Sequence, residues 1–260
     1  MIDQVTNTYL ELVDRELPGF VQGLYLVGSA VLDAWQPELS DIDTIVFTAR
    51  EPAADDLATL DRIHRSLATR PYFDSVYVPP SLATTWPTHK EPVPFVVNGA
   101  FQTGKPCGEL TPVVWQVLQR YGVKVRGPEI ADLDVRVDPG ELLRYNLDNL
   151  RDYWQPSVVA NEPHLAALDP AEPLDAETVV WFVTGPARLH HTAATGDIIS
   201  KAAAADYLAS QFPQHAALAR RAAAFRTGSP EVFTLPDLRE AFDSVHTVAN
   251  DAWRRFAARR

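Results

Sequence analysis

The sequence predicts a mixed α/β domain followed by an all-helical domain, and three observations support this. Strand-like apolar runs alternate with amphipathic helical segments in the first half of the 260-residue chain. From residue 176 onward, every periodic segment has helical spacing. Hydrophobic residues make up 46% of the chain, enough for one or two ordinary cores. We expect an α/β (α+β) domain with a mixed sheet over residues 1–155 and a helical-bundle domain over residues 156–260.

Hydrophobic spacing and helix-ending residues define the elements of the first domain. Apolar residues at helical spacing predict a first helix over residues 4–16, which Pro18 and Gly19 end. Runs rich in β-branched and aromatic residues predict strands at 24–27, 42–47, 73–78 and 123–125, with 95–97 as a candidate for one more. Further helices are expected at 30–35, 55–67, 113–121 and 139–154, whereas residues 80–108 read as an irregular excursion.

After a loop-like stretch from residue 156 to residue 173, only helices are expected. Ser200 is suited to cap one of them, and Pro186 should kink another. The four predicted helices cover residues 176–195, 200–212, 214–225 and 236–259.

Charge and cysteine content exclude several classes of protein. The net charge of −11 repels phosphate backbones, so duplex nucleic acid is not expected as a partner, whereas a cationic small molecule fits the balance. A single cysteine, Cys107, forms no internal disulfide and indicates a reducing compartment. No run of 18 apolar residues occurs, and the first residues carry acids in place of a basic leader. We therefore expect a soluble, cytoplasmic protein without a membrane partner.

One stretch of the first domain joins a tight turn to two acids. Gly28 permits close approach of the backbone to a ligand, and Ser29 begins a predicted helix whose exposed N–H groups can hold phosphate oxygens. Asp41 and Asp43 stand two residues apart at the start of a predicted strand, so both carboxylates point to one face. Magnesium prefers such hard oxygen ligands and completes its shell with substrate phosphates. This stretch predicts a site for magnesium and a nucleotide.

A third acid, Asp74, occupies another predicted strand whose other residues favour a buried sheet. If the two strands are neighbours, three carboxylates converge. Three uncompensated acids at close range repel one another and raise one another's pKa, so the cluster favours a divalent cation or a general base. We therefore interpret Asp41, Asp43 and Asp74 as the candidate catalytic and metal-binding residues.

These residues resemble a known signature. Gly28-Ser29, Ser40-Asp41-Ile42-Asp43 and an acid on the following strand are similar to the motif of the polymerase-beta-type nucleotidyltransferases. The segments 109–128, 185–196 and 199–203 further resemble the aminoglycoside adenylyltransferases of the streptomycin/spectinomycin type. The resemblance covers most of the chain. It implies a nucleotidyltransferase domain over residues 1–155 and a helical domain over residues 156–260 that completes the ATP and acceptor site.

The resemblance also implies a reaction, in which AMP passes from ATP to a hydroxyl of an aminoglycoside or aminocyclitol antibiotic and pyrophosphate leaves. In this reading Asp41 and Asp43 hold two Mg²⁺ ions, and Asp74 takes the proton of the acceptor hydroxyl. The residues implied to bind the ATP triphosphate are Gly28, Ser29, Ser40, Arg188 and Lys201.

The chain departs from the family pattern mainly at the acceptor site. The acid that begins the second domain's first helix in streptomycin-modifying members would fall on Thr178, with Asp175 and Glu177 close but out of register. These three are the candidate substrate residues. The tryptophan of those members has no counterpart within residues 95–101, and Asp74 replaces their usual glutamate. The departures argue against streptomycin itself as the acceptor.

Two other functions remain open on the sequence alone. One keeps the chemistry and changes the acceptor to a protein or another metabolite; the other is a non-catalytic nucleotide-binding module. His190 and His191 are adjacent on a predicted helix, where they point about 100° apart and do not chelate together, so we expect them to pack or to lie at the surface. Trp154 and Trp181 fall at helical core positions. We expect the chain to be a monomer.

Overall fold

A computed structural model describes residues 1–37, 39–83 and 91–259 of the chain. Its contacts divide the chain into two compact units, Met1–Val137 and Asp138–Arg260. The boundary expected at residues 155/156 therefore differs from the observed one, because helix α4 (Pro139–Asn149) packs against helix α6 (Ala176–Thr195) in the second unit. Helical periodicity had shown that α4 is amphipathic, but it does not show which domain receives the apolar face.

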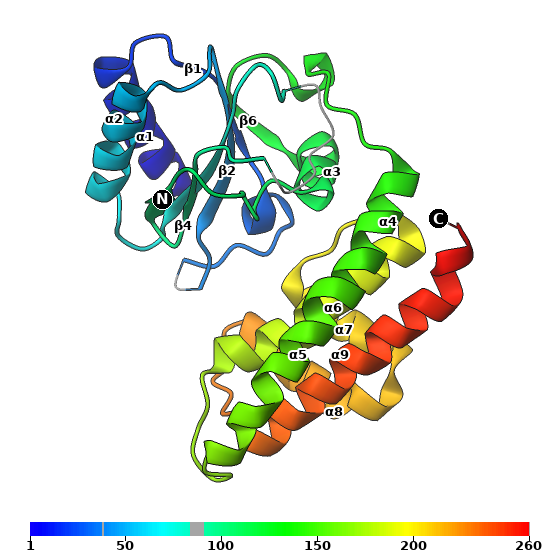
Figure 1. Cartoon of the computed structure of the whole chain (residues 1–260). Helices are drawn as coiled ribbons and strands as arrows, with labels where there is room; N and C mark the ends of the chain where they lie inside the picture. Colours follow the sequence, from blue (N-terminus) through cyan, green and yellow to red (C-terminus); the bar gives the residue numbers. More distant parts are fainter. Residues whose placement is uncertain (38, 84–90, 260) are drawn as a thin grey trace. The chain divides into compact units, whose positions relative to one another are not determined.

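A six-stranded mixed sheet with the order β5-β4-β3-β2-β1-β6 forms the centre of the first unit (Figure 1). Strands β2 and β3 pair in parallel, and all the other neighbouring strands pair antiparallel. The strands are β1 (Val21–Leu26), β2 (Ile42–Thr48), β3 (Phe73–Val78), β4 (Phe95–Val97), β5 (Ala100–Gln102) and β6 (Val123–Arg126). The predicted fold class is confirmed.

The two faces of the sheet have different covers. Helices α1 (Ile2–Glu16) and α2 (Ala54–Ser66) pack on one face, where Tyr9 and Leu60 join a buried cluster with Ile42. Helix α3 (Pro112–Tyr121) lies on the other face, and its buried Trp115 contacts Phe47 of β2 (Figure 1). Because side chains alternate along a strand, Asp43 of β2 lies on the same face as Phe47.

Two short elements of this unit differ from the sequence prediction. In place of the helix expected over residues 30–35, the chain forms a four-residue 3₁₀ helix, η1 (Gly28–Val31). Within the irregular excursion, the candidate strand β4 is present and is followed by β5, which the sequence analysis missed. The residues of β5 are Ala100, Phe101 and Gln102, which lack the β-branched side chains that indicated β4.

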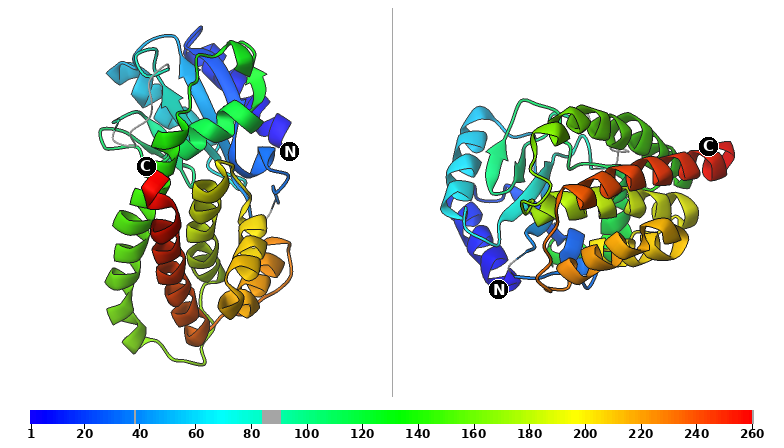
Figure 2. Two further views of the ribbon diagram at one scale, coloured as in Figure 1. Left: turned by 90° about the vertical axis from the view of Figure 1, so that its right-hand side faces the viewer. Right: turned by 90° about the horizontal axis from the view of Figure 1, so that it is seen from below.

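The second unit consists of helices packed side by side (Figure 2). Helix α4 continues through a π-helical segment (Leu150–Trp154) into α5 (Gln155–Asn161), so the expectation that residues 156–173 form a loop is wrong over its first part. Pro156 is the second residue of α5 and directly follows the π-helical segment, where the regular i→i−4 hydrogen bonds are already interrupted, so the helical run continues through it. The remaining helices are α6, α7 (Lys201–Gln211), α8 (Ala216–Arg226) and α9 (Leu235–Phe256).

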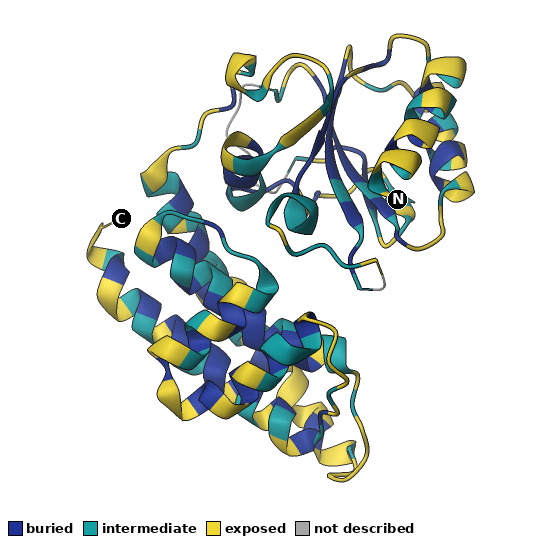
Figure 3. Cartoon of the chain, turned by 180° about the vertical axis from the view of Figure 1, so that it is seen from behind, coloured by how far each residue is buried: buried dark blue, intermediate teal, exposed yellow. Residues whose placement is uncertain are grey.

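Each unit has a core of its own, as the buried positions in Figure 3 illustrate. In the helical unit Phe182 of α6 meets Phe242 of α9 edge to face, with ring centroids 4.7 Å apart. Trp154 is buried, and Trp181 packs against it with ring centroids 4.2 Å apart. The predicted core positions of both residues are confirmed. Among the described residues, no helix has the length and apolar character needed to cross a membrane.

Candidate active site

The site is centred on a pair of carboxylates at the start of the parallel strands β2 and β3. Asp43 and Asp74 are direct register partners, so their Cα atoms lie side by side on one face of the sheet. The central strands follow from their β-branched and aromatic residues, which fill the buried positions around each acid. The condition stated for convergence of the acids, that the Asp74 strand lies beside the strand of Asp43, is met.

Gly28 brings the backbone against the Asp43 carboxylate. Its φ of +64° is a left-handed conformation, and a Cβ atom placed on it would lie 2.0 Å from Asp43 Oδ2. The N–H of the preceding residue, Val27, donates to the Asp43 carbonyl at 2.9 Å. The backbone of the turn after β1 therefore lies directly against the Asp43 carboxylate. This close approach explains why position 28 is a glycine.

Asp41 lies immediately before β2 and accepts two bonds from the segment that leads into β3. Its Oδ1 accepts the N–H of Tyr72 at 3.3 Å, and Arg70 Nη1 lies 3.5 Å from the same oxygen. The Arg70 guanidinium also sits over the Tyr72 ring, 5.0 Å from its centroid. The segment between α2 and β3 thus supplies a positive charge close to this acid.

Asp74 is held by the backbone of the β4–β5 turn. Its carboxylate accepts the N–H of Asn98 at 2.7 Å on Oδ2 and the N–H of Gly99 at 3.0 Å on Oδ1. Burial raises the pKa of the Asp74 carboxyl, the two N–H groups oppose that rise, and the nearby charge of Asp41 adds to it. The net pKa is above the ordinary value of an aspartate, a direction that suits a proton acceptor.

Two predicted nucleotide residues have local structural partners. Ser29 lies in η1, and its carbonyl accepts the N–H groups of Leu32 and Ala34. Ser40 is buried, and its hydroxyl accepts the N–H of Gln36 at 3.1 Å, which fixes the loop that ends at Asp41. Both precede Asp41 and Asp43 in the sequence, and their contact with a triphosphate stays a prediction.

The carboxylate oxygens of this site fit a magnesium ion that binds together with a nucleotide. In the described parts of the chain, no three His, Cys, Asp or Glu side chains are grouped so that they could hold a metal ion. Magnesium in nucleotide enzymes commonly takes one or two carboxylates and completes its shell with phosphate oxygens and water. The carboxylates of Asp41 and Asp43, with Gly28 closing directly on Asp43, are compatible with that arrangement. Binding of a metal ion by Asp41, Asp43 and Asp74 together stays a prediction.

Sequence reasoning missed three residues around Asp74. Asn98 and Gly99 stand in an Asn-Gly pair, which is a strong signal for a two-residue hairpin turn and was available in the sequence. Glu109 is a further acid near this site: burial raises the pKa of its carboxyl, and the charge of Asp74 raises it further. Only the tertiary structure brings Glu109 near Asp74, because 35 residues separate them in the chain.

The two basic candidates lie together within the helical unit. Arg188 of α6 donates from Nε to the carbonyl of Ile199 at 3.0 Å. Lys201 follows two residues later as the first residue of α7, whose N-terminus is capped by the Ser200 side chain through the N–H of Ala203. The predicted capping role of Ser200 is confirmed. The α6–α7 connection therefore holds both cations at one end of α7, where the helix dipole adds positive potential.

The three predicted substrate residues have structural roles at the start of α6. Asp175 is the N-cap: its Oδ2 accepts the N–H of Thr178 at 2.9 Å and the Thr178 hydroxyl at 2.6 Å. Glu177 forms an ion pair with Arg226 of α8 at 3.2 Å. These contacts explain why acids occur in the first turn of α6. Binding of an acceptor by the same residues stays a prediction.

The adjacent histidines pack, as predicted. His190 is fully buried, with Nδ1 2.8 Å from the Tyr207 hydroxyl and Nε2 3.0 Å from Asp251. Burial lowers the pKa of His190, which favours its neutral form. His191 Nδ1 lies 3.2 Å from the carbonyl of Asp197.

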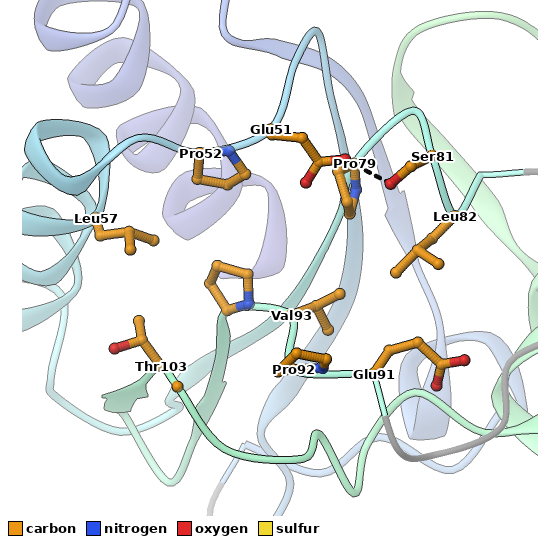
Figure 4. A pocket seen from close by; sticks show the side chains of 12 residues that line it. Glu51, Pro52, Leu57, Pro79, Ser81, Leu82, Glu91, Pro92, Val93 and Thr103 are labelled. Carbon is orange, nitrogen blue, oxygen red and sulfur yellow. Dashed lines mark hydrogen bonds between the residues drawn. The ribbon is translucent and has the colours of Figure 1, made fainter.

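A separate pocket of about 300 Å³ lies at the other ends of β2 and β3 (Figure 4). Prolines 52, 79, 92 and 94 make up much of its wall, and Glu51 accepts a hydrogen bond from Ser81 at its rim. None of the predicted site residues lines it. The pocket is therefore distinct from the acid pair.

Comparison with known proteins agrees with this arrangement. Residues 7–78, which span α1 to β3, match the family described as a nucleotidyltransferase domain. The crystal structure of spectinomycin adenyltransferase AAD(9) from Enterococcus faecialis, solved with ATP and spectinomycin, superposes with a TM-score of 0.73. The two chains are 14% identical, and the match covers 95% of this chain and 99% of the other. No curated protein sequence matches the chain.

The chain thus carries a nucleotidyltransferase domain and has the fold of AAD(9). It is an enzyme of the nucleotidyltransferase class, as predicted. The matched residues contain Gly28, Asp43 and Asp74, which the geometry brings together, and also Asp41.

Proposed function

We propose that the chain is a magnesium-dependent adenylyltransferase that transfers AMP from ATP to a hydroxyl of an aminoglycoside or aminocyclitol antibiotic and releases pyrophosphate. The observation that carries this proposal is the register pair of Asp43 and Asp74 with the Gly28 backbone closed against Asp43. In this arrangement the Gly28 turn can approach a phosphate, Asp43 can bind a metal ion, and Asp74 can act as a base. All three lie on one face of a rigid sheet.

Asp74 acts as the general base. Its carboxylate takes the proton of the acceptor hydroxyl while that oxygen attacks the α-phosphorus of ATP. A new P–O bond forms, the bond to the β-phosphate oxygen breaks, and pyrophosphate leaves. The raised pKa of Asp74 moves it toward the range in which a base is effective near neutral pH.

Asp41 and Asp43 would hold the magnesium ions, with Asp74 as a further oxygen ligand. When bound, magnesium neutralises phosphate charge and polarises the α-phosphate. In the protein itself, Gly28, Ser29 and Ser40 orient the triphosphate next to these acids. Arg188 and Lys201 of the helical unit supply positive charge for the triphosphate.

The acceptor class is supported by charge and by fold. The chain has a net charge of −11, which attracts polycationic drugs. AAD(9), whose fold it shares, was solved with spectinomycin, and we propose the same class of acceptor here. Asp175, Glu177 and Thr178 are the proposed acceptor residues. We expect the protein to act as a cytoplasmic monomer.

The test is intact-mass analysis of a panel of aminoglycosides and aminocyclitols, spectinomycin and streptomycin included, after incubation with the protein, ATP and Mg²⁺. We expect a gain of one AMP on at least one drug, and none on streptomycin. Asp74→Ala should lower the rate by on the order of a hundredfold to ten-thousandfold while Mg·ATP still binds. Asp41→Ala should weaken metal binding as well.

Two results would change the conclusion. Absence of an adduct on every drug, with ATP still bound and pyrophosphate released on addition of a cell extract, would move the acceptor to a protein or another metabolite. Full turnover by both Asp74→Ala and Asp41→Ala would overturn the mechanism.

A further inference from the structure

We propose that the Asn98–Gly99 turn is a positioning element that holds Asp74 in the orientation a proton acceptor needs, and that its geometry is matched to aspartate. The inference rests on the proposed function for the role of Asp74. The turn connects β4 to β5, and its neighbours Val97 and Ala100 are register partners, so it is a two-residue hairpin turn.

Sheet register places this turn beside Asp74. Strand β4 runs antiparallel to β3, with Phe95 opposite Val76, so the end of β4 lies at the level of Asp74. Asn98 and Gly99 have φ of +52° and +71°, the pair of positive values that a type I′ turn requires. In this conformation both N–H groups face the same carboxylate, one on each oxygen.

Two hydrogen bonds fix the orientation of the Asp74 carboxylate and leave lone pairs that can accept a proton. An ionised carboxylate has about four lone-pair sites, of which the turn uses one on each oxygen. The free sites then have defined directions, and one can receive the proton of the acceptor hydroxyl.

The turn itself is tightly held, which makes its geometry specific. A Cβ atom on Gly99 would lie 2.8 Å from Tyr72 Cδ1, and the N–H of Tyr72 in turn donates to Asp41. The turn therefore has little space in which to move away from the Asp74 carboxylate. A glutamate at position 74 would carry its carboxylate about 1.5 Å further, so it could not make both bonds unless the turn moved. We infer that the aspartate and the turn function as a matched pair.

The first test reads the hydrogen bonds directly, without turnover. The amide resonances of Asn98 and Gly99 are followed by NMR in the full-length wild type, Asp74→Ala and Asp74→Glu. We expect downfield amide protons in the wild type, an upfield shift of both in Asp74→Ala, and an upfield shift of at least one of them in Asp74→Glu. Unchanged amide resonances in Asp74→Ala would overturn the proposal.

The second test uses a matched glycine. Gly104→Ala introduces the same backbone strain as Gly99→Ala, because Gly104 has φ of +69°, but its Cβ would meet nothing within 4 Å. We expect Gly99→Ala to lower kcat by about tenfold to a hundredfold with an unchanged KM for ATP, and Gly104→Ala to retain wild-type kcat. Asn98→Gly, which adopts positive φ freely, should retain more activity than Asn98→Val.

The two proposals fail in different ways. Equal kcat in Gly99→Ala and Gly104→Ala would overturn the positioning role while the proposed function stands. A wild type that transfers AMP to no acceptor would refute the proposed function. The amide resonances would then decide alone whether the turn holds Asp74.

Discussion

Single glycines determine how close the backbone comes to the acids of this site. Gly28 has φ of +64° and lies against the Asp43 carboxylate, whereas Gly19, with φ of +73°, has open space where its side chain would be. Both need a left-handed conformation, so both lose stability on substitution by a residue with a Cβ atom. Of the two, only Gly28 also lies directly against a carboxylate of the candidate site.

Gly28→Ala is therefore expected to displace Asp43 and to abolish AMP transfer. Its free energy of unfolding should fall by about 1–3 kcal/mol more than that of Gly19→Ala, because the added methyl group overlaps a carboxylate held between packed strands. Chemical denaturation together with the drug-adduct assay measures both effects. Equal activity of the two variants would show that the close approach is dispensable.

At the scale of elements, the start of α6 combines a capping function with a proposed binding function. Asp175 accepts the N–H and the hydroxyl of Thr178, and Glu177 pairs with Arg226. These contacts stabilise the helix whether or not a drug binds there. A variant that keeps the cap and removes the charge separates the two functions.

Asp175→Ala should destabilise the chain by about 1 kcal/mol, whereas Asp175→Asn should be nearly neutral, since asparagine caps helices equally well. If Asp175 also binds a drug amine, Asp175→Asn will raise KM for the acceptor without a change in stability. Thermal unfolding and steady-state kinetics on both variants check this. An unchanged KM in Asp175→Asn would confine this residue to capping.

The elements themselves were largely predictable, for a physical reason that also explains the exceptions. The β3 strand and the α6 helix have the bounds that periodicity predicts, because each is long enough to repeat its pattern. The β5 strand consists of Ala100, Phe101 and Gln102, and the absence of a β-branched residue leaves it without a strand signal. The helical run through Pro156 was missed because proline was interpreted as a break, although it follows a π-helical turn in which the regular hydrogen bonds are already interrupted.

At the scale of the whole molecule, stability depends on pH through buried histidines. His64 is packed between Phe73 and Phe101 and hydrogen-bonds to Tyr77, and burial lowers its pKa from 6.5 to about 3. Below pH 6.5 the unfolded chain binds a proton that the folded chain does not. Stability is therefore fully present above pH 6.5 and falls as the pH drops toward 3.

We expect the free energy of unfolding to fall by up to about 1.4 kcal/mol per pH unit through this window from His64 alone. His64→Gln should make the free energy of unfolding depend less steeply on pH between about pH 6 and pH 4, roughly the middle of that window. Denaturant unfolding at several pH values measures the slope, and the difference between wild type and variant isolates His64 from His190, whose pKa is also lowered by burial. Parallel slopes for the two proteins would contradict the prediction.

The acidic net charge gives a second whole-molecule prediction. A chain of net charge −11 attracts a polycationic drug over distances that salt screens, with a Debye length of about 10 Å at 0.1 M ionic strength. KM for the drug should therefore rise with added salt, and kcat should change little. Steady-state kinetics in increasing NaCl checks this, with a neutral acceptor analogue as the control. A KM independent of salt would exclude steering by the overall charge.

Sequence reasoning was sufficient to predict the two kinds of domain, most element bounds, and the candidate site residues Gly28, Asp41, Asp43 and Asp74, because these depend on local periodicity and on which side chains can bind a cation or a proton. The folded chain was needed to show that Asp43 and Asp74 are register partners, that the Asn98–Gly99 turn holds Asp74, and that α4 belongs to the helical unit. These facts depend on strand pairing and on the choice of packing partner, which are set by contacts between residues far apart in the chain and leave no local pattern in the sequence.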